Sequence, residues 1–202
     1  TFQGHSFHTS RWDFDYTGSN LENLGDKVVG IIGTGATAVQ AVPNLAREAK
    51  ELFVFQRTPS SIDVRDDWET DPEWAKTLTP GWQAKRRERA MQMGSLTAIR
   101  VDADGKEIEI SAEEKVRRQE NANIDYMMRI HKRIDEIVED PTTADALKPW
   151  YMFMCKRPCF HNDYLPSFNQ PNVHLIDTHG KGITEIGPDG PVFEGTTYKL
   201  DL

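Results

Sequence analysis

Two glycines and an alanine with the spacing G-x-G-x-x-A are the residues of this 202-residue chain best suited to binding a ligand. They are Gly33, Gly35 and Ala38, within the stretch GTGATA. Gly33 permits a tight turn, Gly35 lets backbone N–H groups approach a phosphate, and Ala38 lets a helix pack closely on a sheet. A helix N-terminus here would add unpaired N–H donors and partial positive charge. The pattern predicts a site for a dinucleotide pyrophosphate; the alternative is a glycine turn that only connects a strand to a helix.

The segments around this turn predict a β-α-β unit. KVVGIIG (27–33) is a short run rich in Val and Ile, which is typical of a buried parallel strand. Apolar residues at helical spacing follow over 36–50, and ELFVFQR (51–57) has the composition of a second strand. Pro43 falls inside the expected helix, which must either kink there or lose one hydrogen bond.

The end of the second strand indicates which dinucleotide to expect. An NAD site needs a carboxylate there for the ribose 2′-hydroxyl, whereas an NADP site needs a cation for the 2′-phosphate. The chain has Arg57 followed by Thr58, and Glu51 stands at the wrong end of the strand. A guanidinium presents phosphate with a planar, permanently charged fork of donors. We therefore expect NADP(H), the alternative being that Arg57 is an ordinary surface residue.

The remainder of the chain indicates an α/β protein with an insertion. Residues 66–149 are charged and rich in helix formers, with no comparable strand. Residues 182–202 carry short apolar runs separated by GPDG and EG, which predicts a β-meander whose last strand runs from Tyr198 to Leu202. The expected organisation is a linker over 1–26, a Rossmann-like NADP-binding domain formed by 27–65 and 150–202, and a helical insertion over 66–149.

Composition excludes several classes of partner. A formal net charge of -8 argues against nucleic acid and against an anionic membrane surface. The apolar run WYMFMC (150–155) is far shorter than a bilayer span, and two cysteines make no disulfide framework, so we expect a cytoplasmic protein. Cys155, Cys159 and His161 lack a second pair of ligands, so no metal site is expected.

The chain opens, after one threonine, with FQGHSFHTSRWD, in which Phe2, Gly4, His8, Trp12 and Asp13 have the spacing F-x-G-x-x-x-H-x-x-x-W-D. This stretch is followed by GTGATA, VFQRTP, KRP and FNQPNV. The combination resembles the Baeyer–Villiger monooxygenases, flavoenzymes that insert one oxygen atom of O2 beside a ketone carbonyl. Within that family the stretches GATAVQ and RTPSSIDVR are most similar to the steroid and cyclic-ketone branch.

The resemblance implies a flavoprotein with two dinucleotide-binding domains, one for FAD and one for NADP(H), acting on a small-molecule ketone and O2. It implies that the pyrophosphate is bound by Thr34, Gly35, Ala36, Thr37, Ala38, Val39 and Gln40. It further implies that Arg57, Thr58 and Lys156 hold the 2′-phosphate. Arg157 corresponds to the active-site arginine. Because a guanidinium stays protonated at working pH, it can stabilise the anions that form as O2 and the ketone react.

In that family the opening segment links the flavin and nicotinamide domains. We expect Phe2 and Trp12 to anchor it by burial, and His8 and Asp13 to make orienting hydrogen bonds; the alternative is a purely structural linker. The flavin-binding segments of the family are not in this sequence, so we expect that the chain alone neither binds FAD nor catalyses oxygenation. Two alternatives remain open: an N- or S-oxidising flavin monooxygenase, which Trp12-Asp13 disfavours, and a stand-alone NADP-binding module without catalysis.

Overall fold

The computed structural model describes residues 1–93, 100–101, 107–108 and 110–202. It consists of two compact units, Thr1–Arg65 with Arg129–Leu202, and Asp66–Met128. The second unit is shorter than the helical insertion expected over 66–149, because residues from 129 onward pack within the first unit. Ile130 and Ile134, for example, are fully buried. Residues 94–99, 102–106 and 109 of the expected insertion lie outside the described residues.

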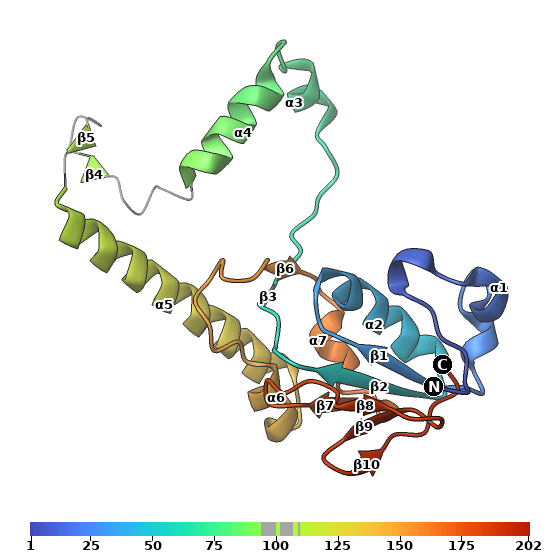
Figure 1. The fold of residues 1–202 in the computed structure, drawn as a ribbon. Helices are drawn as coiled ribbons and strands as arrows, with labels where there is room; N and C mark the ends of the chain where they lie inside the picture. The colour runs from blue at the N-terminus through green and yellow to red at the C-terminus, as the bar shows by residue number, and fades with distance from the viewer. Residues whose placement is uncertain (94–99, 102–106, 109) are drawn as a thin grey trace. The chain divides into compact units, whose positions relative to one another are not determined.

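The first unit is built on a parallel sheet with the strand order β1-β2-β7 (Figure 1). Its strands are β1 (Val28–Ile32), β2 (Glu51–Gln56) and β7 (Val173–Asp177). Helix α2 (Ala36–Glu48) connects β1 to β2, so the predicted β-α-β unit is present. Because all three strands run in parallel, their carboxyl ends lie at one edge of the sheet.

Helix α2 packs against β1, β2 and the short helix α7 (Tyr164–Ser167) through the apolar side of its periodic sequence. Its interior residues Val42 and Leu45 are almost completely buried. Pro43 is also buried and does not end the helix, which continues to Glu48. The helix therefore tolerates the loss of one backbone hydrogen bond because tertiary packing holds it.

The C-terminal region forms an antiparallel sheet with the order β10-β9-β8. Its strands are β8 (Glu185–Ile186), β9 (Pro191–Phe193) and β10 (Thr196–Thr197). The strand expected from Tyr198 to Leu202 is not formed. This segment instead runs beside β1, where the Gly30 N–H donates to Leu202 O at 2.8 Å. A Cβ at Gly30 would lie 2.3 Å from Leu200 Cδ1, so the glycine makes room for this approach.

Short elements complete the two units. In the first unit these are η1 (Thr9–Arg11), α1 (Phe14–Thr17), η2 (Glu22–Leu24), β3 (Ile62–Asp63), α6 (Pro141–Leu147) and β6 (Cys159–Phe160). The second unit contains α3 (Pro72–Lys76), α4 (Trp82–Met93), β4 (Arg100–Val101) and β5 (Glu107–Ile108). Helix α5 (Ala112–Ile137) begins in the second unit and ends in the first. Among the helices of the described part, none is both long and apolar enough to cross a membrane.

Candidate functional site

A cavity of about 870 Å³ opens at the carboxyl edge of the parallel sheet. Its floor is the glycine turn between β1 and α2, and its walls come from segments that follow β2 and β7 and precede β6. We call this cavity the groove. Four cationic side chains line it: Arg57, Lys156, Arg157 and Lys181. In a chain with a net charge of -8, this is a local concentration of positive charge suited to an anion.

The glycine turn leaves its backbone accessible. Gly33 has φ +106, a conformation that disfavours side chains, and its N–H donates to Phe55 O at 2.9 Å. A Cβ built on either Gly33 or Gly35 meets no atom within 4 Å, so both glycines border open space. Gly35 precedes α2 without a side-chain cap, which leaves N–H groups of the first helical turn without intrahelical partners. These features fit a phosphate at this turn.

Thr34 fixes the turn against the end of β2. Its hydroxyl donates to Thr58 O at 2.8 Å, and its own carbonyl accepts a hydrogen bond from the Ser60 hydroxyl. The Thr34 residue is 5% exposed. The hydrogen bonds of Thr34 thus hold the glycine turn and the β2 terminus together.

Arg57 and Lys156 lie close enough for their charges to interact. Partial burial, and then the positive charge of Arg57, lower the pKa of the Lys156 ammonium. In the part of the chain that the structure describes, neither cation forms an ion pair with a carboxylate. The Lys156 Nζ lies 5.1 Å from the centroid of the Tyr151 ring, whose hydroxyl donates to Pro59 O at 2.8 Å. Two adjacent cations without a counter-charge are an arrangement that an anion would stabilise.

A short ladder places Lys156 and Arg157 at the groove. Strand β6, just after them, pairs in parallel with β3, just after Arg57 and Thr58. The Cys159 N–H donates to Ser61 O at 2.8 Å, and the His161 N–H donates to Asp63 O at 3.0 Å. Arg157 is exposed, lines the groove, and has no ion-pair partner among the described residues.

Not every predicted residue presents its side chain to the groove. The side chains of Ala38 and Val39 are buried in the core beneath the sheet-facing side of α2. Gln40 is exposed and donates to Ala36 O at 3.0 Å. Thr37 is also exposed and does not line the groove. Of these residues, Ala38 and Val39 can contribute only through backbone groups or through packing, because their side chains are buried.

Sequence reasoning missed Lys181 and Thr178, which line the groove after β7. The stretch HLID (174–177) precedes them, and no local pattern there shows that it forms a strand beside β2. In the structure Gln56 lies opposite Asp177, so the residues that follow both strands meet at the same edge. Only the pairing of β7 with β2 in the tertiary structure therefore identifies Thr178 and Lys181 as groove residues.

The opening segment is held by local contacts and by the C-terminal segment. A Cβ at Gly4 would lie 2.4 Å from Phe2 Cζ and 2.8 Å from Asp201 O, so this position needs glycine. The His5 N–H donates to Asp201 O at 2.9 Å. Phe2 is half-buried, and its ring folds over Gly4.

The other three residues of the F-x-G-x-x-x-H-x-x-x-W-D spacing make short-range hydrogen bonds, and two of them cap helices. His8 is exposed, and its Nδ1 caps η1 by accepting a hydrogen bond from the Ser10 N–H. The same Nδ1 lies 2.7 Å from the Ser10 hydroxyl. Asp13 caps α1 by accepting from the Tyr16 N–H, and its carboxylate lies 2.9 Å from His5 Nε2. Trp12 is half-buried and donates through Nε1 to the Thr17 hydroxyl at 3.0 Å. His5, which lies at an unspecified position of the spacing, is thus a principal partner of Asp13.

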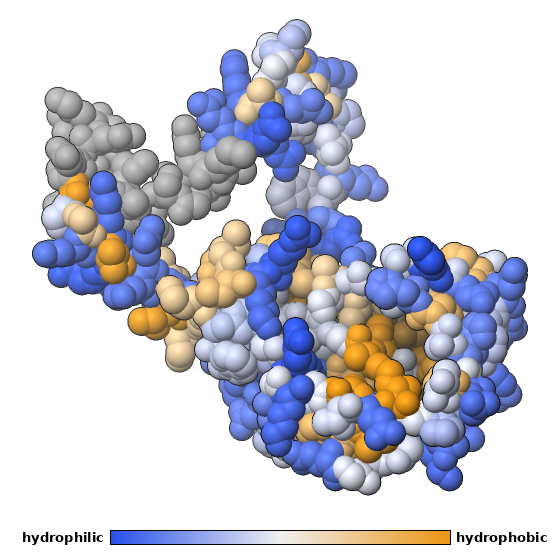
Figure 2. Space-filling view, viewed as in Figure 1, coloured by the Kyte–Doolittle hydropathy of each residue, from blue (hydrophilic) through white to orange (hydrophobic). Residues whose placement is uncertain are grey.

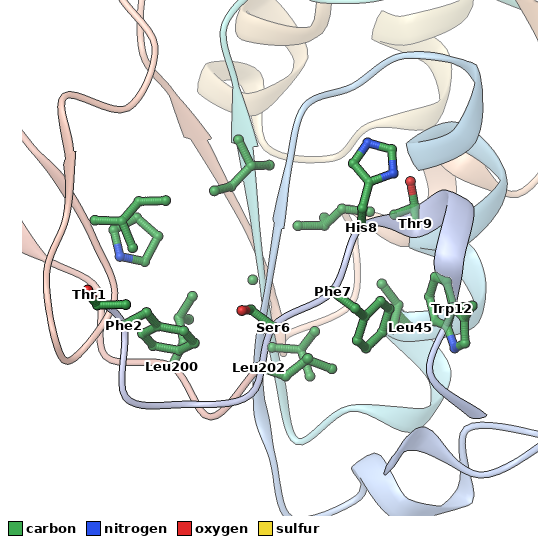
Figure 3. Close-up of a pocket in the computed structure, with 16 residues that line it drawn as sticks. Thr1, Phe2, Ser6, Phe7, His8, Thr9, Trp12, Leu45, Leu200 and Leu202 are labelled. Carbon is green, nitrogen blue, oxygen red and sulfur yellow. The ribbon is translucent and has the colours of Figure 1, made fainter. Parts of the chain in front are cut away.

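A second cavity, of about 530 Å³, lies between the opening segment and β1. We call it the apolar pocket. Phe7 and Trp12 meet in an edge-to-face contact at 5.2 Å beside Leu45, and Phe2 lies beside Leu200 (Figure 3). Figure 2 shows apolar side chains gathered over β1 on this face of the first unit. Ile32 and Ile186 line both the apolar pocket and the groove, and they are 56% and 49% exposed.

Metal-binding chemistry has no counterpart in the described residues, which contain no cluster of three or more potential His, Cys, Asp or Glu ligands. Cys155 is exposed and Cys159 is buried, and both are free thiols.

Comparison with known proteins gives matches along the whole chain. No family model matches it. It is 48% identical over 221 residues to Baeyer-Villiger monooxygenase ATR8 of Stachybotrys chlorohalonatus, a match that covers 99% of this chain and 35% of that protein. The solved structure of a polycyclic ketone monooxygenase from the thermophilic fungus Thermothelomyces thermophila is 39% identical, with a TM-score of 0.82, and the match covers 100% of this chain and 36% of that one. A complex of OTEMO with FAD and NADP is 27% identical, with a TM-score of 0.68, over 99% of this chain and 41% of that one. The chain therefore spans little more than a third of the length of these relatives.

Proposed function

We propose that this chain is the NADP(H)-binding portion of a Baeyer–Villiger monooxygenase, since it is homologous along its whole length to about a third of such an enzyme. The β1-α2-β2 unit with β7 would then be the core of a Rossmann-like NADP-binding domain, with the β8–β10 sheet as its C-terminal meander. Residues 66–149 are proposed as an insertion into this domain, and 1–26 as the linker to the rest of the protein.

The single observation that carries this proposal is the groove itself. It combines an open glycine turn, the N-terminus of a 13-residue helix and two cations, Arg57 and Lys156, that have no carboxylate partner among the described residues. The turn supplies N–H donors for a pyrophosphate, and Arg57 with Lys156 supplies positive charge for a 2′-phosphate. A solved structure of the similar protein OTEMO is a complex with FAD and NADP, which supports the same choice of cofactor.

The arrangement also gives the dinucleotide a direction. Arg57, Thr58 and Lys156 at the β2 end would hold the phosphorylated adenosine, and the backbone of Thr34–Ala36 would hold the pyrophosphate. The nicotinamide end would then lie toward the exposed side chains of Ile32 and Ile186. These two residues are shared with the apolar pocket, so the reactive end would lie where the two cavities adjoin.

Arg157 is proposed as the catalytic residue of this portion. When bound, NADPH and the FAD of the longer protein would supply the electrons and the O2 activation needed for insertion beside a ketone carbonyl. The contribution of this chain is a guanidinium that keeps its positive charge and faces the groove without a carboxylate partner among the described residues. Such a group stabilises negative charge on oxygen atoms without exchanging protons.

The apolar pocket is proposed as a contact surface for the flavin domain of the longer protein. Ile32 and Ile186 are about half exposed, and contiguous exposed apolar surface usually marks an interface. The half-buried rings of Phe2, Phe7 and Trp12 line the same pocket (Figure 3). Packing of a further domain here would bury them and complete the core of the linker.

Paired titrations with NADP+ and NAD+ test the cofactor assignment. We expect the chain to bind NADP+ more tightly than NAD+. Arg57→Ala should remove most of that preference by lowering NADP+ affinity about 10- to 100-fold, which corresponds to the free energy of one charge-assisted hydrogen bond. Arg47→Ala is the matched control, because Arg47 is an exposed arginine in the last turn of α2, away from the groove. Equal affinities of the unaltered protein for the two nucleotides would refute the proposal.

A further inference from the structure

Lys181 lines the groove from a segment that is distant in sequence from the other three cations. It belongs to residues 178–182, which follow β7. Because β7 pairs in parallel with β2, and Gln56 lies opposite Asp177, this segment leaves the sheet beside the segment that carries Arg57. Lys181 therefore lies on the side of the groove that carries Arg57, where the 2′-phosphate is proposed to bind.

Hydrogen bonds hold this segment in place. Both the N–H and the hydroxyl of Thr178 donate to Gln56 O at 2.8 Å, which ties the segment to the last residue of β2. The Lys181 N–H donates to Thr178 O at 2.9 Å, and the Gly182 N–H donates to the Thr178 hydroxyl at 2.9 Å. Gly182 has φ +81, and a Cβ at this position would lie 3.6 Å from Arg57 Cδ. The backbone of Lys181 is thus fixed next to the Arg57 side chain.

The Lys181 ammonium already has an anionic partner. Its Nζ lies 2.7 Å from Glu194 Oε1, and the two side chains are 62% and 57% exposed. Glu194 occupies the turn between β9 and β10 and does not line the groove. The hydrogen bond from Lys181 lowers the pKa of the Glu194 carboxyl, so this partner is ionised at neutral pH. Ion pairs this exposed are weak, so the ammonium can leave the carboxylate at little cost.

We propose that Lys181 is a further specificity-determining residue, which binds the 2′-phosphate of NADP(H), and that Glu194 competes with the phosphate for it. This inference rests on the proposed function. A phosphate monoester carries a charge of about -1.5 to -2 at neutral pH and three strong acceptor oxygens, against a single charge on Glu194. With Arg57 and Lys156 at the same end of the groove, the ammonium gains more from the phosphate than from the carboxylate. Without the 2′-phosphate it stays with Glu194.

Calorimetric titration of NADP+ and NAD+ into three variants tests the inference. We expect Lys181→Met to weaken NADP+ binding about tenfold and to leave NAD+ binding within about twofold. Glu194→Gln should strengthen NADP+ binding a few-fold, because the competitor is gone. In the double variant the effect of Glu194→Gln should disappear, since the group for which it competes is absent. Lys199→Met is the control, because Lys199 is an exposed lysine of the C-terminal segment that does not line the groove.

Two results would overturn the inference. The first is a Lys181→Met variant with an unchanged ratio of NADP+ to NAD+ affinity. The second is a Glu194→Gln effect of equal size with and without Lys181, which would mean that the carboxylate acts only through its general field. If Arg57→Ala removes the NADP+ preference while Lys181→Met keeps it, only this inference fails. If neither the unaltered protein nor any variant distinguishes the two nucleotides, the proposed function itself fails.

Discussion

Replacing Gly35 with alanine separates the fold of the glycine turn from its ligand. Gly35 has φ -76 and ψ -176, an extended conformation that alanine adopts without strain. A Cβ at this position meets no atom within 4 Å, so no neighbour has to move. The only group expected to contact the new methyl is a bound phosphate. Gly35→Ala should therefore impair nucleotide binding in a protein that folds normally.

The expected change in stability is small because two effects oppose each other. Replacing glycine with alanine reduces the entropy of the unfolded chain and stabilises by ~0.4–1 kcal/mol. Alanine is a poorer N-cap than glycine by a similar amount. The free energy of unfolding should thus change by less than about 0.5 kcal/mol. Gly33→Ala is the contrasting variant, because φ +106 at Gly33 should make alanine destabilising by about 1–3 kcal/mol.

Urea denaturation and NADP+ titration of the same samples measure the two quantities. We expect Gly35→Ala to unfold at the same urea concentration as the unaltered protein and to bind NADP+ at least about tenfold more weakly. Normal NADP+ affinity in Gly35→Ala would show that no phosphate approaches this backbone. A loss of stability above about 2 kcal/mol would show that the position is packed, contrary to the open space described above.

Two further predictions concern thiol access and acid stability. A thiol-specific reagent should modify Cys155 in the native protein and Cys159 only after unfolding in urea. Cys155 is exposed, whereas Cys159 is buried and its burial raises the pKa of its thiol. Immediate reaction of both thiols would contradict this prediction. The hydrogen bond from the Tyr16 N–H, and then the contact with His5, lower the pKa of the Asp13 carboxyl in the folded protein. The Asp13 carboxylate therefore stabilises the fold above the pKa that Asp13 has in the unfolded chain, and this contribution is lost as pH falls through the lower pKa of the folded state. The difference in urea midpoint between the unaltered protein and Asp13→Asn should accordingly shrink below about pH 4, and a difference that stays constant between about pH 3 and 6 would count against this assignment.

What the sequence determined by itself is the part of the site that is local. The stretch from 27 to 57 contains a strand, a turn, a helix and a strand in succession, and each is set by periodicity and by glycine within a few residues. A right-handed β-α-β connection then leaves few arrangements, so Gly33, Gly35 and Arg57 could be placed at one edge of a sheet from the sequence alone. Their positions in the structure agree with that placement.

What only the tertiary structure decided is which distant segments complete this edge. Arg65 and Asn162, 97 positions apart, exchange hydrogen bonds beside the β3–β6 pair that delivers Lys156 and Arg157. Lys181 reaches the groove because β7 adds to β2. Backbone hydrogen bonding is the same for any pair of strands, so partner choice depends on the packing of the whole core and leaves no signature in a short window. The segment from Tyr198 to Leu202 illustrates this. Its apolar pattern predicts a strand of the meander, but in the structure it lies alongside β1, where Gly30 has no side chain that would collide with Leu200.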